Sequence, residues 1–267
     1  MLAELVQVAP NNFKINNYVA QCYLAYGYPE MAFDYIKSNP QVFSDRYFMN
    51  AWSSLMSIAT DYGDDKTMDS VLEQIVKVYE KDGLTPPELA SIHGFQSRVI
   101  GYLNSQKRYE EAVKRADENL KWFDGKAKEL ENSPFFTSNA ANNPEIKDYY
   151  YGVYFLTVKL STFMYRQQAL AYLKRDLDKL YEPFEKMLKD AEQLKFGEKS
   201  SYRAQPYYVK YRVLYTISTV ARAAGDNEKS TEYSKLGKEA YDRYRSEIDK
   251  MKKEQEAAKK AQEEAKE

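Results

Sequence analysis

The chain has 267 residues, of which 43% are hydrophobic and 30% are charged, and its 39 basic and 40 acidic residues give a net charge of -1. This composition is typical of a folded soluble protein, and the balanced charge argues against DNA, RNA or an anionic membrane as a partner. The single cysteine, Cys22, excludes an intramolecular disulfide. No apolar run of about 18 residues is present, so we expect no membrane insertion.

The start of the chain, MLAELVQVAPNN, lacks the basic region and apolar core of a secretory signal. Residues 1–8 are typical of a helix that ends before Pro10, which indicates a chain that opens partway through a repeat. Cytoplasmic and periplasmic locations both stay open, since a signal can have been removed. The sequence leaves the compartment and the oligomeric state undetermined.

Helical periodicity runs through most of the chain, and the nine prolines and ten glycines fall mostly between the periodic segments. No convincing alternating strand pattern is found. The predicted fold class is therefore all-α. The expected helices span residues 13–26, 29–38, 45–61, 65–82, 87–104, 108–123, 145–172, 174–196, 204–224 and 227 to about 260.

The joints between several of these helices resemble one another. They are 26-YGYPEMAFDYI-36, 62-YGDDKTMDSVL-72, 106-QKRYEEAVKRA-116 and 224-AGDNEKSTEYS-234. Each ends an apolar helix, turns within a few residues and starts a helix with acidic residues, which suit the positive end of the helix dipole. Gly27, Gly63 and Gly225 occupy the turn position, where a positive φ costs glycine little, and Lys107 occupies it in the remaining joint.

These joints resemble the tetratricopeptide repeat (TPR) family, whose unit is a helix–turn–helix of about 34 residues. The positions of the family pattern fall on Val19, Ala20, Tyr23, Gly27 and Ala32; Trp52, Leu55, Ala59, Gly63 and Met68; Val99, Leu103 and Ala112; and Leu214, Ile217, Ser218, Gly225 and Ser230. Met68 and Lys107 depart from it, because alanine and glycine are usual there. The resemblance implies a superhelical array of antiparallel helix pairs, a TPR-like α-solenoid, over residues 1–245.

Three segments are irregular in this scheme. The long interval between turn positions 107 and 225 must hold at least one irregular unit, built from helices 145–172 and 174–196. An insertion at about 124–145 contains Phe135 and Phe136, which either pin the loop onto neighbouring helices or form a lid over a groove. Residues 246–267 are predicted to be a charged, solvated helical tail; the alternative, a partner-binding coiled coil, lacks a heptad core.

Motifs for catalysis, metal binding and cofactor binding are not found in the sequence. His93 is the only histidine, which excludes a paired-histidine metal site within one chain, and Cys22 lies in the apolar string YVAQCYLA, which favours an inert thiol. No phosphate-binding glycine loop or nucleophile elbow is present. Composition leaves open a hydrolase with two carboxylates. We nevertheless predict a non-enzyme with no catalytic residues, no metal and no cofactor.

The family resemblance implies a ligand groove on the concave face, which the first helix of each unit lines. The candidate partner-binding residues there are Asn17, Gln21, Asn50, Ser53, Ser57, Arg98, Asn104, Arg212, Tyr215 and Arg222. Amides and hydroxyls suit an extended peptide backbone. Alternatively, Ser53, Ser57 and Gly101 are small only to let adjacent helices approach. Of the residues with which one subfamily grips a terminal carboxylate, only Arg98 has a counterpart.

We therefore expect a non-enzymatic scaffold that binds an unidentified protein or extended peptide in this groove. An alternative is a carbohydrate- or small-ligand-binding protein that uses the tyrosine-rich helices as a stacking platform. Their sequences are 148-DYYYGVYFLTVKLSTFMYRQQ-168 and 206-PYYVKYRVLYTI-217. The simpler interpretation is that these tyrosines fill the spaces between helices.

Overall fold

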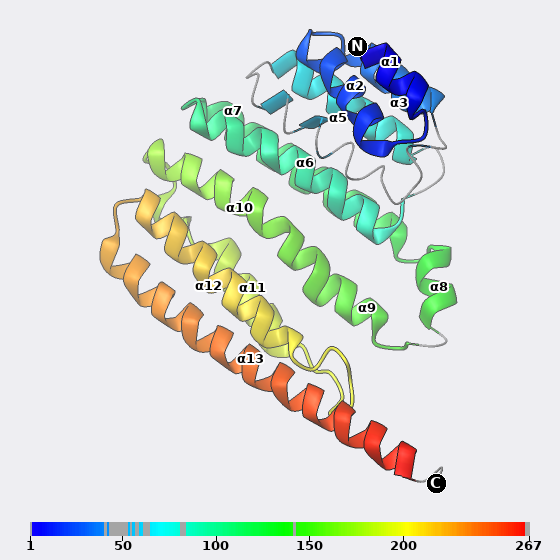
Figure 1. The fold of residues 1–267 in the computed structure, drawn as a ribbon. Coiled ribbons are helices and arrows are strands. Elements are labelled where there is room, and N and C mark those ends of the chain that lie inside the picture. Colours follow the sequence, from blue (N-terminus) through cyan, green and yellow to red (C-terminus); the bar gives the residue numbers. More distant parts are fainter. Residues whose placement is uncertain are drawn as a thin grey trace. The chain divides into compact units, whose positions relative to one another are not determined.

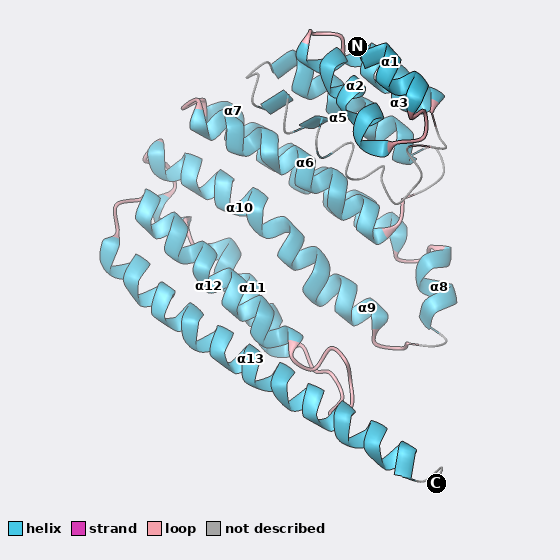
Figure 2. Cartoon of the chain, in the orientation of Figure 1, coloured by secondary structure: helices cyan, strands magenta, loops and turns pink. Residues whose placement is uncertain are grey.

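In a computed structural model of the chain, the described part consists of helices joined by turns and loops, with no strand (Figure 2). The described residues are 2–39, 42, 53, 55–56, 59–60, 65–80, 84–140 and 143–264. The predicted all-α class is therefore confirmed. Most of the predicted helix 45–61 lies outside these residues, as do Asn50, Trp52, Ser57 and Gly63. The chain forms two compact units, Met1–Lys107 and Arg108–Glu267.

The helices of the first unit are α1 (Leu2–Val8), α2 (Phe13–Ala25), α3 (Pro29–Ser38), α5 (Asp65–Glu80) and α6 (Pro86–Ser105). Two of them, α2 and α6, begin at side-chain capping signals. The side chain of Asn12 accepts a hydrogen bond from the Ile15 N–H at 3.2 Å and so caps α2. Before α6, the Thr85 N–H donates to the Glu88 carboxylate at 2.8 Å.

The core of the first unit forms where each helix packs against the next, from α1 through α2, α3 and α5 to α6. Fully buried residues include Phe33, Ile36, Leu55, Met68 and Ile75. Met68 stands where the repeat pattern has a small residue, and its flexible thioether side chain is accommodated in this core without exposure.

The second unit contains longer helices, shown from green to red in Figure 1. They are α7 (Tyr109–Leu130), α8 (Pro134–Ala140), α9 (Ile146–Tyr149), the π-helix η1 (Tyr150–Tyr154), α10 (Phe155–Tyr172), the short 3-10 helix η2 (Leu177–Lys179), α11 (Glu182–Gln193), α12 (Gln205–Ala223) and α13 (Asn227–Glu264). The elements α9, η1 and α10 follow without a break and correspond to the predicted helix 145–172.

The predicted helix 174–196 is wrong in its first part, because α11 begins only at Glu182. Lys174 and Asp176 have positive φ angles of 54° and 49°, which interrupt a right-handed helix. Pro183 then lies in the first turn of α11, where its missing N–H costs nothing.

The helices α7 and α10 pack side by side and run antiparallel (Figure 1). Near one end Tyr109 stacks on Tyr172 with 4.9 Å between ring centroids, and further along Phe123 meets the edge of the Phe155 ring at 5.3 Å. On the other side of α10, a core cluster joins it to α11 and α12. Its buried members include Val153, Leu156, Leu160, Leu170, Leu180, Phe184, Met187, Val209, Val213, Ile217 and Val220.

The helix ends that precede the joints share one turn geometry. Gly27 and Gly225 have φ angles of 79° and 80°, so the positive φ expected at these glycines is confirmed. Lys107, which departs from the glycine pattern, also has a positive φ, of 58°. Lys174, which the sequence prediction missed, has the same geometry: its N–H donates to the Ala171 carbonyl at 3.1 Å. The following N–H, of Arg175, donates to the Leu170 carbonyl at 3.0 Å. This pair of bonds is the Schellman motif.

The region predicted as an insertion is partly helical. Helix α7 continues to Leu130, and α8 follows after a short turn. Phe136 of α8 is fully buried, and both Phe135 and Phe136 meet the Tyr150 ring edge-on, with centroids 5.3 Å and 5.5 Å away. The two rings thus anchor α8 on the π-helix, which corresponds to the first of the two interpretations of this segment.

Candidate functional site

Three of the candidate partner-binding residues lie on one face of α12. Arg212, Tyr215 and Arg222 follow one another at the three- and seven-residue spacings that return to the same side of a helix. Tyr215 is 40% exposed and Arg222 is exposed, whereas Val213 and Ile217 are buried in the core. The side of α12 that turns away from the core therefore carries these predicted residues.

The guanidinium of Arg212 is held in place by its neighbour one turn earlier. Arg212 Nη1 donates a hydrogen bond to the Tyr208 hydroxyl at 2.7 Å, and Arg212 Cζ lies 5.7 Å from the centroid of the Tyr208 ring. Arg212 itself is half-buried. The contact fixes one edge of the guanidinium, which has further N–H groups to donate.

Tyrosines of α12 and α13 form a continuous row beside Arg212. The Tyr208 and Tyr244 ring centroids are 5.4 Å apart, those of Tyr211 and Tyr241 5.0 Å, and those of Tyr211 and Tyr215 5.1 Å. We call these five residues the tyrosine strip. The sequence prediction missed its two α13 members, although their spacing of three residues in YDRY already places them on one side of a helix.

In the first unit the structure brings Ser53 and Arg98 together. Arg98 Nη2 donates to the Ser53 hydroxyl at 3.2 Å, and Nη1 donates to the Ser53 carbonyl at 3.3 Å. The Arg98 guanidinium also lies 5.6 Å from the centroid of the Phe95 ring. Arg98 is exposed and Ser53 is half-buried, so this contact links two candidate residues at the protein surface.

The remaining candidates of the first unit are half-buried. Asn17 and Gln21 lie on α2, and Asn104 lies near the end of α6. The side-chain oxygen of Asn17 is buried and accepts no hydrogen bond from the described residues. Asn50 and Ser57 lie outside the described part of the chain.

A second surface feature, which the sequence prediction missed, is an open cleft of about 470 Å³ in the second unit. It lies between the end of α11 and the start of α12, and the connecting segment 194–204 forms part of its wall. We call it the α11–α12 cleft. Its lining residues are Ala191, Glu192, Leu194, Lys195, Phe196, Arg203, Pro206, Tyr207 and Lys210.

One side of segment 194–204 is fastened by Glu145. Its carboxylate accepts hydrogen bonds from the Gly197 N–H at 2.9 Å and from the Ser200 hydroxyl. The Ser200 and Gly197 bonds lower the pKa of the Glu145 carboxyl, because they stabilise its charged form. Nearby, the Tyr202 ring stacks on Tyr149 with 4.3 Å between centroids.

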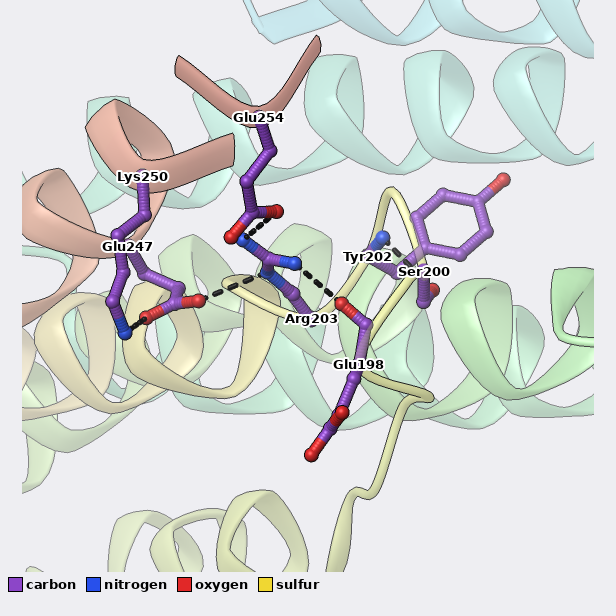
Figure 3. A network of polar contacts seen from close by, with 7 residues as sticks. All are labelled: Glu198, Ser200, Tyr202, Arg203, Glu247, Lys250 and Glu254. Carbon is purple, nitrogen blue, oxygen red and sulfur yellow. Dashed lines mark hydrogen bonds and ion pairs between the residues drawn. The ribbon is translucent and has the colours of Figure 1, made fainter. Parts of the chain in front are cut away.

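The other side of the segment is fastened to α13 by Arg203 (Figure 3). Arg203 Nε lies 2.9 Å from a Glu247 carboxylate oxygen, and Nη2 lies 2.7 Å from a Glu254 oxygen. Arg203 Nη1 also donates to the Glu198 carbonyl within the segment. The Arg203 side chain is only 15% exposed. Hydrogen bonding to Glu254, together with the charges of both carboxylates, raises the pKa of Arg203.

Metal-binding and membrane-spanning features are not found in the described residues. No group of three or more His, Cys, Asp or Glu side chains gathers there in a way that could hold a metal ion. No helix in the described ranges combines the length and apolar character needed to cross a bilayer. Comparisons of this chain with protein-family models, with curated proteins and with solved structures gave no match.

Proposed function

We propose that this chain is a non-enzymatic binding protein of the helical-repeat type, which holds an extended peptide or a segment of a protein partner. The observation that carries the proposal is the outward face of α12, where Arg212, Tyr215 and Arg222 lie in line and Arg212 is held by Tyr208. We assign the peptide to this face and to the adjacent tyrosine strip.

The pairing of helices in the second unit supports a repeat of hairpins. Helix α10 packs against both α7 and α12, α12 packs against α11, and α12 packs most extensively against α13. Stacked antiparallel helix pairs have contacts of this kind, with α7–α10 and α12–α13 as the antiparallel pairs and α11 packed on α12. The shared turn geometry at Lys107, Lys174 and Gly225 adds to the similarity between the units. In such an array α12 is a first helix, whose outward face lines the groove.

The chemistry of the α12 face suits peptide recognition. Tyrosine and arginine are the residues in which binding energy at protein interfaces is concentrated, because both combine a large contact area with hydrogen-bonding groups. The ring of Tyr215 is packed against Tyr211, and the Arg212 guanidinium is bonded to Tyr208, so little side-chain entropy is lost on binding. Their free donors match the carbonyl groups of an extended peptide.

The sugar-stacking alternative has less support from the geometry of Tyr149–Tyr154. Those rings are half-buried, and they contact one another, Phe135, Phe136 and Tyr202. Burial raises the pKa of Tyr149 and of Tyr154, as expected for hydroxyl groups partly removed from water. Rings that already fill the spaces between helices offer little free face to a sugar.

A peptide-display selection tests the proposal. Peptides from a random library are selected on the native chain, and their affinities are then measured against the R212A/Y215S double variant. We expect the variant to bind the selected peptides at least about tenfold more weakly, the loss typical of central interface residues. The matched control is R175A/L177S, which changes exposed residues of the turn before α11 and should bind as the native chain does. A library that yields no binder, or binders indifferent to R212A/Y215S, would overturn the proposal.

A further inference from the structure

We propose that the α11–α12 cleft is a separate binding site for a small organic anion, in which a phosphate or carboxylate group is joined to a planar ring. The site shares no residue with the α12 face assigned to the peptide. The argument rests on the size of the cleft, the rigidity of its wall, its charge and its apolar lining.

The cleft has the volume of a ligand site and a wall that is formed in advance. Its volume of about 470 Å³ falls within the range of roughly 300 to 1,000 Å³ that is usual for small-molecule pockets. Segment 194–204 has little regular structure, yet Glu145 holds it at Gly197 and Ser200, and Glu247 and Glu254 hold it at Arg203. A wall fixed before the ligand arrives costs less entropy on binding.

Positive charge predominates in the lining. Lys195, Arg203 and Lys210 face the cleft, and Glu192 is its one acidic residue. Lys210 Nζ lies 3.4 Å from the Glu192 carboxylate, so these two opposite charges neutralise each other. Arg203 is paired with the carboxylates of α13. Lys195 is exposed and makes no ion pair with the described residues. Its ammonium group is therefore the charge that an incoming anion can pair with.

The start of α12 adds to the positive potential. Pro206 and Tyr207, in the first turn of this 19-residue helix, line the cleft. No acidic residue occurs in that turn, whereas α11 has Glu182 and Glu185 in its own first turn. The Gln205 and Tyr207 N–H groups already donate to the Tyr202 and Ala204 carbonyls, so the start of α12 contributes its dipole, but no free N–H donor, to the potential beside the cleft.

The apolar part of the lining specifies the other half of the ligand. Phe196 and Tyr207 contribute rings, and Leu194, Ala191 and Pro206 contribute aliphatic surface. Phe196 is half-buried, whereas Tyr207 is 38% exposed. A flat ring gains contact area against such side chains while its anionic substituent stays near Lys195.

Calorimetric titration at low salt tests the site with probes of defined chemistry. Adenosine monophosphate represents the phosphate source and indole-3-acetate the carboxylate source; adenosine and indole-3-acetamide are their neutral counterparts. We expect at least one anion to bind, and its neutral counterpart to bind at least about tenfold more weakly, since the charged group supplies much of the affinity. Binding of only one of the two anions also supports the site, and it shows whether the site takes a phosphate or a carboxylate group.

The variant K195E should weaken binding of the anion by about tenfold or more, because it replaces the attraction by repulsion. The matched control K189E reverses an exposed lysine of α11 outside the lining and should change the affinity less than about twofold. Equal binding to K195E and the native chain, equal binding of the neutral probes, or no binding of either anion overturns the site. R212A/Y215S should leave anion binding unchanged, so the peptide site and the anion site succeed or fail separately.

Discussion

Gly237 of α13 faces the ring of Tyr215 on α12, and a Cβ atom at position 237 would lie only 2.8 Å from Tyr215 Cδ2. The absence of a side chain at this position therefore allows the ring to lie against α13. Gly237 is buried in the middle of a long helix, where glycine is otherwise unfavourable. Tyr215 and Gly237 should thus be energetically coupled.

We predict that G237A leaves the free energy of unfolding nearly unchanged in the native background. Alanine favours the helix by about 1 kcal/mol, but it displaces Tyr215 from Tyr211, a contact worth roughly 0.5 to 1.5 kcal/mol. In a Y215A background the same change should stabilise the protein by about 1 kcal/mol, because no ring is displaced. Urea denaturation of the four proteins completes the double-mutant cycle; additive effects would contradict the coupling.

The lysines with positive φ give a second prediction. Lys107 and Lys174 have φ angles of 58° and 54°, which strain a residue that has a Cβ atom. K107G and K174G should each raise the free energy of unfolding by about 0.5 to 1 kcal/mol, a gain reduced by the greater entropy of glycine in the unfolded chain. The measurement is chemical denaturation followed by circular dichroism.

The control for these lysine variants is G225A, at a turn with a φ of 80°. No atom lies within 4 Å of a Cβ built at Gly225, so only backbone strain opposes alanine there. G225A should lose about 1 kcal/mol. If both lysine variants were less stable than the native chain, backbone strain at these turns would not determine the change in the free energy of unfolding.

The buried ring of Phe136 is expected to hold α8 against the rest of the second unit. F136A removes the contacts with Tyr150 and Tyr151 and leaves a cavity under α8, so this short helix should detach while the rest of the unit stays folded. Limited proteolysis should then cut within residues 131–145 several times faster than in the native chain. T137A, which changes an exposed residue of the same helix, is the control. Equal cutting of F136A and T137A would mean that the ring does not anchor α8.

Glu145 makes the attachment of segment 194–204 dependent on pH. Its pKa is lowered by hydrogen bonds from Ser200 and Gly197, so the native state favours the charged carboxylate. The Glu145 carboxylate therefore makes its full contribution to the free energy of unfolding when the pH is above 4.5, the ordinary pKa of glutamate. This contribution is lost as the pH falls through the lowered pKa. The Gly197 amide resonance should report a midpoint below 4.5 in the native chain.

E145Q is the matched variant for this titration, because it keeps the shape of the side chain without the ionisation. The Gly197 amide of E145Q should show no transition in the same range of pH. A native midpoint at or above 4.5 would show that the two hydrogen bonds do not stabilise the carboxylate.

Arg203 connects the cleft wall to the second half of α13. R203M retains the aliphatic bulk of the side chain but removes the pairs with Glu247 and Glu254. Amide hydrogen exchange should become faster both in segment 198–204 and in residues 247–264, since each loses its link to the other. R243M, at an exposed position of the same helix, should leave both regions unchanged. Faster exchange in only one region would show that Arg203 does not couple them.

The sequence predicts much of the fold because its signals are local. Helix ends at Gly27 and Gly225 follow from glycine in a turn, and the positions of most helices follow from hydrophobic periodicity. The sequence also predicts the helix end at residue 172 but places the start of the next helix too early, at 174, because lysine rarely adopts a positive φ and the helical pattern continues beyond it. Such a conformation is imposed by tertiary packing rather than by the residue itself.

The candidate sites show the same division. The alignment of Arg212, Tyr215 and Arg222 is a property of one helix and can be read from spacing alone. The α11–α12 cleft depends on contacts between distant residues, such as Ser200 with Glu145, 55 positions apart in the chain. No local sequence pattern predicts that segment 194–204 will be held by hydrogen bonds and ion pairs on both sides, so the cleft could be found only from the structure.

The π-helix Tyr150–Tyr154 sets the rotational phase between the two ends of the run 146–172. Each residue of an α-helix advances the side chains by about 100°, so one residue deleted here, with α geometry restored, would turn Tyr149 by roughly that angle relative to α10. Its ring would then leave Tyr202, and Glu145 would be carried away from Ser200. The one extra residue of the π-helix thus lets the helical run 146–172 place Tyr149 against segment 194–204 at one end and its aliphatic side chains against α12 along the rest.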